Sequence, residues 1–430
     1  MKLHDALEVH LDLRRPGEPS PETVQVGSLR GSFQGASRVL GSVRFEYAAA
    51  YLNNERRIAL SPALPLFRGP QYLEADGLLP DVFSDTAPDD WGQSVIREEV
   101  SRAQPGVQLG PFDFLSLTSD STRMGALRYQ DSSGSWLAPS VQPLPETPGD
   151  WTDNVSRYIG AAHRFEQWEA TEADMMLLGA AGSTLGGARP KVVIERDGSL
   201  WLLKLPSNRD QRTDTEAWEA LALDLAHLSD IRVPRHTLVH SSKGGSALMI
   251  ERFDRRSDHR LHYISAQTAL GAGPGTSETY EDLADALEML AAPRGDLQEL
   301  FVRIAFNVLI SNRDDHWRNH GFIFDQGWRL SPAFDLNPVR ASSPIRSRPI
   351  NKMDDPTDRN IAHLLDACAT YALTTAQAAE MLAPLVDTIP RWREIALRRK
   401  ISEQEIESMA SAFRDDQFEM VKAFVEKHHS

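Results

Sequence analysis

The sequence predicts an α+β protein whose first part is rich in strands and whose last part is helical. Segments in which apolar and polar residues alternate, the pattern of a half-buried strand, occur repeatedly before residue 255. From residue 280 onward the apolar segments are instead long enough for helices. A stretch rich in Ser, Pro and Gly at 132–148 interrupts the strand-rich part and is typical of a linker. Together these features predict two or three domains in the 430-residue chain.

The composition is that of a globular protein with an acidic surface. Hydrophobic residues make up 41% and charged residues 25% of the chain, which is ordinary for a protein that buries a core. The formal net charge is −15. This charge argues against bulk binding to nucleic acid, which requires a basic face, and it favours a basic partner.

Cysteine usage and hydropathy bear on location. Cys368 is the single cysteine, so no internal disulfide can form and a reducing, cytoplasmic setting is expected. Its apolar neighbours predict a buried, inert thiol. The first residues lack the apolar core of a signal peptide, and no stretch approaches about 18 uninterrupted apolar residues. We therefore expect no membrane association.

Residues 1–148 are expected to form an N-terminal strand-rich subdomain. Alternation predicts three strands in it, at 7–13, 24–26 and 43–47. A helix is expected to begin at Asp89 and Asp90, because carboxylates at a helix start accept hydrogen bonds from free backbone N–H groups and suit the helix dipole.

Residues 149–252 are expected to form a nucleotide-binding lobe. A helix near 153–169 leads to a glycine-rich stretch and two strands at 191–195 and 199–205. Glycines ahead of a strand let backbone N–H groups approach a phosphate closely. The stretch is neither a Walker loop nor a dinucleotide fingerprint, and a plain loop before a hairpin is the alternative. Its candidate nucleotide-binding residues are Gly182, Gly186 and Gly187.

Lys204 is the informative residue of the second strand. It lies within the apolar run WLLKLP, where an unpaired ammonium is costly, so its position predicts an anionic partner. In protein kinases a strand lysine binds the nucleotide phosphates and pairs with a glutamate of the next helix. A helix is expected at 213–228 and carries Glu216 and Glu219. We favour Glu219, which lies one turn further into the helix.

The end of this lobe is expected to border the adenine of a nucleotide. Strands at 233–239 and 247–254 close the lobe with an apolar-to-charged transition. By position alone, Glu251 and Phe253 are nucleotide-binding candidates. Residues 253–430 are expected to form a helical lobe, with helices at 280–290, 297–310, 360–368, 375–387 and 403–427.

The stretch NVLISNRDDHWRNHGFIFDQGWRLSPAFD organises the functional prediction. Asp314 and Asn319 lie on an expected loop, and Asp335 follows an expected hairpin at 321–330. Protein kinases use Asp, Asn and Asp in this order: the first accepts the substrate hydroxyl proton, and the other two hold magnesium against the nucleotide phosphates. Solvated loop residues are the alternative for the first pair. The complete order, with a hairpin between, favours phosphoryl transfer.

The order of elements thus predicts a protein-kinase-like two-lobed fold with an additional N-terminal subdomain. A small-molecule phosphotransferase acting on an aminoglycoside, choline or a lipid head group would use the same three residues. A non-catalytic scaffold would require a missing catalytic group. A zinc hydrolase could use His316 and His320, but the sequence lacks the glutamate of a His-Glu-x-x-His motif.

Several motifs together resemble one bacterial family. GSTLGGARPK, WLLKLP, ERFDR, NVLISNRDDHWRNH and LSPAFDLNP resemble the HipA-type serine/threonine kinase toxins of toxin–antitoxin pairs, and FEYAAAYL, ALPLF and FSDTAPDDWG resemble that family's first subdomain. The resemblance implies that Asp314 is the catalytic base, that Asn319 and Asp335 bind Mg²⁺, and that Lys204 binds the ATP phosphates. His316 would be structural or would assist the substrate. Leu336-Asn337 replaces the usual Phe-Gly of kinases after the magnesium aspartate.

The resemblance also implies regulation and a partner. A hydroxyl in the glycine-rich loop, on Thr184 or the adjacent Ser183, would be autophosphorylated, and its phosphate would clash with those of ATP. A helix-turn-helix antitoxin would bind the protein, with DNA contacted only indirectly through that antitoxin. The protein substrate of the kinase is not indicated by the sequence.

Overall fold

A computed structural model describes residues 3–13, 22–34, 38–138, 151–179, 187–210, 213–241, 245–256, 259–273, 276–340 and 347–428. The chain forms two compact units. Unit 1 consists of Met1–Asn208, Ser241–Gly244 and Met249–Gly271, and unit 2 of Arg209–His240, Gly245–Leu248 and Ala272–Ser430. The mixture of sheets and helices confirms the predicted α+β class. No helix among the described residues is both long and apolar enough to cross a membrane.

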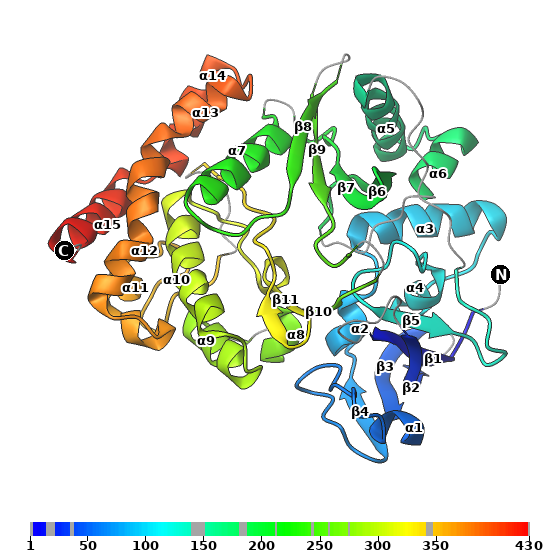
Figure 1. Cartoon of the computed structure of the whole chain (residues 1–430). Coiled ribbons are helices and arrows are strands. Elements are labelled where there is room, and N and C mark those ends of the chain that lie inside the picture. The colour runs from blue at the N-terminus through cyan, green and yellow to red at the C-terminus, as the bar shows by residue number, and fades with distance from the viewer. Residues whose placement is uncertain are drawn as a thin grey trace. The chain divides into compact units, whose positions relative to one another are not determined.

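The N-terminal part of unit 1 is a five-stranded sheet with the order β4-β3-β2-β1-β5 (Figure 1, blue to cyan). Its strands are β1 (Ala6–Leu13), β2 (Glu22–Gln34), β3 (Val39–Tyr47), β4 (Pro70–Glu74) and β5 (Leu127–Gln130). Buried and half-buried residues alternate along β1, as predicted for 7–13, so one face of the strand contributes to the core. The strands predicted at 24–26 and 43–47 are longer than predicted, because β2 and β3 pair with each other from Gly27↔Tyr47 to Gln34↔Val39.

Helices complete unit 1. They are α1 (Ala49–Leu52), α2 (Asp81–Asp85), α3 (Asp90–Ala103), α4 (Pro111–Leu117), α5 (Trp151–Glu166), α6 (Glu172–Gly179) and α8 (Ala266–Leu270). The predicted helix start at Asp89 is confirmed: Asp89 is the N-cap of α3, and its carboxylate accepts a hydrogen bond from Gly92 N at 2.7 Å.

The predicted hairpin of the middle segment is also present in unit 1. β6 (Lys191–Arg196) and β7 (Ser199–Lys204) pair antiparallel, with Lys191 opposite Lys204. β9 (Ser246–Glu251) is the strand that both units contain, because the division between them falls after Leu248. Its end lies in unit 1 with β6, β7 and β10 (His262–Ser265).

Unit 2 contains most of the predicted helices. They are α7 (Thr215–Leu228), α9 (Tyr280–Met289), α10 (Arg294–Leu309), α11 (Ala362–Asp366), α12 (Thr375–Thr388), α13 (Trp392–Arg398), α14 (Glu403–Met409) and α15 (Asp415–His428). Its strands are β8 (His236–His240), β11 (Gly321–Phe324) and β12 (Trp328–Leu330). β11 and β12 form the predicted hairpin. α12 and α15, in orange and red in Figure 1, lie side by side.

One predicted helix is wrong. The apolar pattern at 403–427 predicted a single helix, but α14 ends at Met409 and α15 begins at Asp415. Between them Phe413 adopts an extended conformation, and its ring stacks on Trp392 with centroids 4.2 Å apart. Phe413 is buried, and its extended backbone interrupts the helical conformation between α14 and α15.

Candidate active site

The loop after α10 presents Asp314 to solvent. Asp314 is exposed, and its carboxylate has no hydrogen-bond or ion-pair partner among the described residues. Its backbone carbonyl accepts a hydrogen bond from Asn319 Nδ2 at 2.9 Å. Asn319 ends a 3₁₀ turn, Trp317–Asn319, and is buried. The five-residue spacing therefore closes the loop on itself and leaves the Asp314 carboxylate available.

The next residue, Asp315, anchors the loop from within. It is 1% exposed and accepts hydrogen bonds from Arg359 Nη1 at 2.6 Å, from His320 Nε2 at 2.8 Å and from the hydroxyl of Tyr280. Tyr280 begins α9, and Arg359 precedes α11. Three separate segments of unit 2 thus converge on one buried carboxylate.

Arg359 also fixes the start of the loop. It donates to the carbonyl oxygens of Asn312 at 2.8 Å and of Asn307 at 3.3 Å. Asn312 Nδ2 in turn donates to Asn307 Oδ1 at 3.2 Å. Since Asn307 belongs to α10, the loop is fastened to the helix from which it emerges.

The electrostatics of the anchor favour an ionised Asp315. Burial alone would raise the pKa of this carboxyl, but the hydrogen bond from His320 and the charges of His320 and Arg359 outweigh it and hold the pKa well below its usual range. Burial and the neighbouring Asp315 charge raise the pKa of Tyr280 far above its ordinary value, so this hydroxyl stays protonated and donates.

Asp335 lies beside the start of the same loop. An isolated antiparallel bridge pairs Asn312 with Pro338, three residues after Asp335. Asp335 has a φ of 57°, in the left-handed region that a non-glycine residue rarely adopts, and Asn337 Nδ2 lies 3.4 Å from its Oδ1. Unit 2 therefore brings the segments of Asp314, Asn319 and Asp335 together.

The helix of Glu219 borders the Asp335 segment. Ala333 N donates to Arg232 O at 2.7 Å, just beyond the end of α7, and Arg340 Nη2 donates to Thr213 Oγ1 at 2.8 Å, just before its start. Glu219 lies mid-helix between these two attachments and is 2% exposed. The predicted glutamate and the predicted magnesium aspartate therefore lie on neighbouring segments of unit 2.

In unit 1, Lys204 ends β7 and is half-buried. Its cross-strand neighbour Lys191 is more deeply buried, and Lys191 Nζ binds Asp89 Oδ2 at 2.6 Å and Gly187 O at 3.2 Å. Lys191 therefore connects the end of the glycine-rich stretch to the N-cap of α3.

Burial dominates the electrostatics of this pair. It raises the pKa of Asp89 to about 6, although the positive charge of Lys191 and the hydrogen bond from Gly92 act in the opposite direction. Gly187 has a φ of 118°, and a Cβ at this position would lie 3.1 Å from Lys191 Nζ. The positive φ therefore favours glycine here, whereas a Cβ would require only a small shift of the Lys191 side chain.

The residues after β9 are tied to the N-terminal subdomain within unit 1. Asp254 is fully buried, and its Oδ2 accepts hydrogen bonds from Gly125 N at 2.7 Å, Arg252 Nη2 at 2.7 Å and Arg255 Nη1 at 2.5 Å. Phe253, between the paired residues, has its ring 6.1 Å from that of Tyr263. The candidate adenine-binding segment Glu251–Phe253 thus leads directly into a buried ionic cluster.

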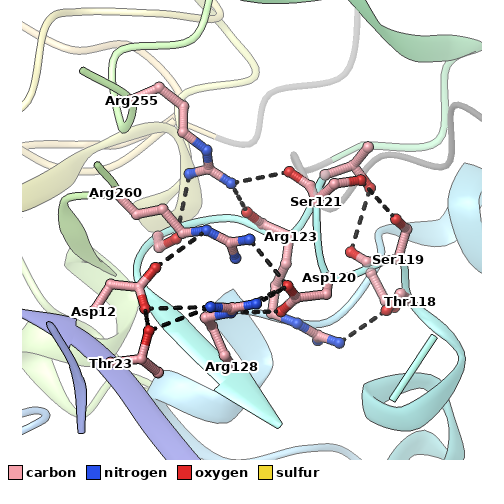
Figure 2. Close-up of polar contacts among 12 residues, drawn as sticks. Asp12, Thr23, Thr118, Ser119, Asp120, Ser121, Arg123, Arg128, Arg255 and Arg260 are labelled. Carbon is pink, nitrogen blue, oxygen red and sulfur yellow. Dashed lines mark hydrogen bonds and ion pairs between the residues drawn. The ribbon is translucent and has the colours of Figure 1, made fainter. Parts of the chain in front are cut away.

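Figure 2 shows the outer part of this cluster. Arg255 donates to the carbonyls of Ser121 and Arg123, while Asp120 accepts from Arg128 at 2.7 Å and from Arg260 at 3.1 Å. Burial lowers the pKa of Arg255 to about 9 despite the opposing charge of Asp254. The same burial would raise the pKa of Asp254, but the charges of Arg252 and Arg255 outweigh it and hold that pKa well below its usual range.

Other predicted site residues either lie outside the part of the chain that the structure describes or have surroundings that differ from those of Asp314. Gly182, Ser183, Thr184 and Gly186 lie outside the described residues, and Gly187 is exposed. His316 is half-buried next to Asp315. His320 is buried against Asp315 and Tyr280, so it has a structural role in the loop. Among the described residues no group of three or more His, Cys, Asp and Glu side chains is arranged to hold a metal ion.

The sequence did not reveal the residues that support the site. They are Tyr280, Asp315, His320 and Arg359 in unit 2 and Asp89 and Lys191 in unit 1. The one available signal was a second aspartate directly after Asp314. The predicted domain limits, 1–148, 149–252 and 253–430, stay a prediction.

Comparison with known proteins gives consistent matches over most of the chain. The HipA N-terminal domain model matches residues 23–130, and the HipA-like C-terminal domain model matches residues 183–393. The putative kinase Y4mE of Sinorhizobium fredii (strain NBRC 101917 / NGR234) is 27% identical over 333 residues, which cover 69% of this chain and 72% of that protein.

A solved structure extends the likeness to the whole fold. HipA of Shewanella oneidensis MR-1, solved with HipB and its operator DNA, has a TM-score of 0.59 and 18% sequence identity, and the match covers 98% of this chain and 97% of that chain. This likeness confirms the predicted kinase-like α+β fold.

Proposed function

Because the chain belongs to the HipA family, with both of its domains present, we propose that it is an ATP- and Mg²⁺-dependent serine/threonine protein kinase and the toxin of a toxin–antitoxin pair. The observation that carries the proposal is the contrast between Asp314 and Asp315. One carboxylate is exposed and unpaired within the described part of unit 2, while its neighbour is buried and holds the loop in place.

Asp314 has the properties of the general base in this proposal. Its carboxylate would accept the proton of a serine or threonine hydroxyl as that oxygen attacks the terminal phosphate of ATP. The proton acceptor must be accessible to a protein substrate, which the exposure of Asp314 allows. The loop must also be rigid, and the contacts of Asp315 supply that rigidity.

Asn319 and Asp335 fit a magnesium site by their donor atoms. Asn319 uses Nδ2 to bind the Asp314 carbonyl, which leaves its Oδ1 available as a ligand. Asp335 adds a carboxylate oxygen, and such hard oxygen donors are those that Mg²⁺ prefers. The bound ion would neutralise charge that develops on the phosphates. Both residues lie on segments joined by the bridge between Asn312 and Pro338.

The remaining predicted residues would bind the nucleotide. Lys204 would contact the phosphates and pair with Glu219, while Glu251 and Phe253 would border adenine. Gly187, with Gly182 and Gly186 of the same stretch, would let backbone N–H groups approach the phosphates. His316 would assist the substrate or stabilise the loop.

The proposed regulation and partner are those that the resemblance to the family implies. Autophosphorylation of Ser183 or Thr184 would place a phosphate where those of ATP bind, and so switch the enzyme off. A helix-turn-helix antitoxin is the proposed partner, through which the protein would contact DNA indirectly. HipA of Shewanella oneidensis was solved with HipB and operator DNA, and the net charge of −15 suits a basic partner. We place this activity in the cytoplasm.

The test is incubation of the purified protein with Mg²⁺ and labelled ATP, followed by mapping of the phosphorylated sites. The proposal expects label on Ser183 or Thr184 in the wild type and none in Asp314→Ala. Asp285→Ala, which removes an exposed carboxylate of α9, serves as the matched control and should label normally. Phosphorylation of an aminoglycoside or choline, without protein label, would instead favour a small-molecule phosphotransferase.

A further inference from the structure

Helix α7 carries Glu219, so the position of the helix sets the position of that carboxylate. In protein kinases the corresponding helix is movable, and its position controls activity. Here α7 belongs to unit 2, together with the C-terminal helices. It contacts both α12 and α13.

Glu405 of α14 holds the first turn of α7. Its Oε1 accepts hydrogen bonds from Asp214 N at 2.8 Å and from the indole Nε1 of Trp218 at 2.7 Å. Asp214 is the N-cap of α7, and its own carboxylate accepts from Ala217 N at 3.1 Å and from the Ser246 hydroxyl at 2.5 Å. One carboxylate thus fixes both the cap and the first turn of the helix.

The last turns of α7 are held by the end of α13 and by α12. Arg399 donates to both carboxylate oxygens of Asp224, at 2.7 and 2.6 Å, and His236 Nε2 lies 3.0 Å from Asp224 Oδ1. Thr388 of α12 donates to the carbonyl of Leu228, the last residue of α7, at 3.3 Å. Contacts to the C-terminal helices therefore exist at both ends of α7.

The helix between these contacts is buried on nearly all sides. Its buried residues are Glu216, Ala217, Trp218, Glu219, Ala220, Leu221, Ala222, Leu223, Leu225 and Ala226. A helix that is apolar around its circumference belongs to a core and has no free face on which to rotate. Outward movement of α7 would expose this surface and break the contacts of Glu405 and Arg399.

Taking the proposed kinase activity as a premise, we infer that α13, α14 and the end of α12 lock α7 in one position, and that Glu405 and Arg399 are positioning residues for Glu219. Movement of this helix is therefore not the means by which the site is switched on and off. The C-terminal helices instead act on the site through α7, by holding Glu219 in one position.

Glu405 offers a matched pair of variants for the test. Both of its hydrogen bonds are accepted by one oxygen from neutral N–H donors, so Glu405→Gln preserves them and Glu405→Ala removes them. Glu407→Ala changes an exposed glutamate of the same helix that pairs with Arg393. Thr374→Ala removes the N-cap of α12, the distant end of that helix, and controls for a general loss of stability.

Two measurements on the full chain decide the inference. Hydrogen exchange of α7 amides should rise at least ten-fold in Glu405→Ala and stay at the wild-type level in Glu405→Gln and Glu407→Ala. The kcat for phosphorylation should fall about 10-fold in Glu405→Ala, with KM for ATP changed less, because a misplaced Glu219 misorients the phosphates rather than the adenine. In a variant that already carries Glu219→Gln, adding Glu405→Ala should lower kcat little further.

Other outcomes would overturn the inference. Unchanged α7 exchange in Glu405→Ala would show that Glu405 does not hold the helix. If Thr374→Ala lowered kcat as much as Glu405→Ala does, Glu405 would be only a general stabilising residue. The same would follow if Glu405→Ala lowered kcat as much in the Glu219→Gln variant as in the wild type. If the wild type transferred no phosphate at all, the proposed function would fail, while the exchange data would still decide whether α7 is locked.

Discussion

The carboxylates of Asp314 and Asp315 are adjacent in the chain and opposite in environment. Asp314 is exposed, whereas Asp315 is 1% exposed and receives hydrogen bonds from Tyr280, His320 and Arg359. Substitution by alanine at Asp314 should therefore affect phosphoryl transfer, whereas substitution by alanine at Asp315 should affect the stability of the fold.

Asp314→Ala should abolish phosphoryl transfer and change the free energy of unfolding by less than about 0.5 kcal/mol, as expected at an exposed position. Asp315→Ala should cost roughly 3–5 kcal/mol, because it leaves the buried Arg359 without its carboxylate. Urea unfolding and labelled ATP turnover measure the two effects. A large loss of stability in Asp314→Ala would show that this carboxylate has a structural partner.

Asp315 should also contribute to acid sensitivity. Its folded pKa lies below the unfolded value of about 3.9, so its stabilising effect is fully present above about pH 4 and is lost as the pH falls through the folded pKa. Between pH 7 and pH 3 the wild type should lose more unfolding free energy than Asp315→Asn. Parallel curves for the wild type and Asp315→Asn would contradict the prediction.

Local patterns predicted much of the fold. Alternation located β1, β6, β7 and the β11–β12 hairpin, and apolar runs located α9, α10 and α12 to within about three residues. β4 was missed because it is mostly exposed and its apolar residues do not alternate with polar ones. Its pairing with β3 is not visible in the local sequence. α13 was missed because it is short and follows Pro390.

The candidate site likewise has residues that the sequence predicted and residues that it did not. Asp314, Asn319 and Asp335 stand out by order and spacing along a single stretch of sequence. Their supports do not, because Asp315 and Arg359 are 44 positions apart and Asp89 and Lys191 are 102 positions apart. No local periodicity encodes such pairs. Only the folded chain brings them together.

The buried pair of Lys191 and Asp89 should make stability depend on pH between about pH 4 and about pH 6. Burial raises the folded pKa of Asp89 to about 6, so the stability contributed by this group is full below about pH 4 and is lost as the pH rises through about 6. Lys191→Met removes the compensating charge and should raise that pKa further.

Lys191→Met should therefore destabilise the protein more at pH 8 than at pH 5.5, by about 1.4 kcal/mol for each unit of additional pKa shift. The double variant Asp89→Asn/Lys191→Met should lose this difference, because neither ionisable group remains. Unfolding in urea at the two pH values measures it. If Lys191→Met lost the same unfolding free energy at pH 5.5 and at pH 8, the Asp89 carboxylate would be solvated in that variant.

Asp254 should couple the N-terminal subdomain to nucleotide binding. Asp254→Ala leaves Arg252 and Arg255 without their shared carboxylate and should cost about 3–5 kcal/mol of unfolding free energy. It should also raise KM for ATP, because Glu251 and Phe253 immediately precede the cluster. Asp131→Ala, at an exposed turn of the same subdomain, should leave KM unchanged. A normal KM in Asp254→Ala would separate the cluster from the nucleotide site.

The division of unit 1 along the chain has a consequence for synthesis in the cell. Gly125 and Asp120 emerge from the ribosome well before their partners Asp254 and Arg260, which follow 129 and 140 positions later. At about 5–20 residues per second, this delay is roughly 7–30 s. During that time Gly125 N lacks its buried acceptor, and Asp120 has Arg128 but not yet Arg260 as a partner, so unit 1 can be completed only after residue 260 has been synthesised. A pause in translation shortly before residue 260 would lengthen the interval in which these partners are missing.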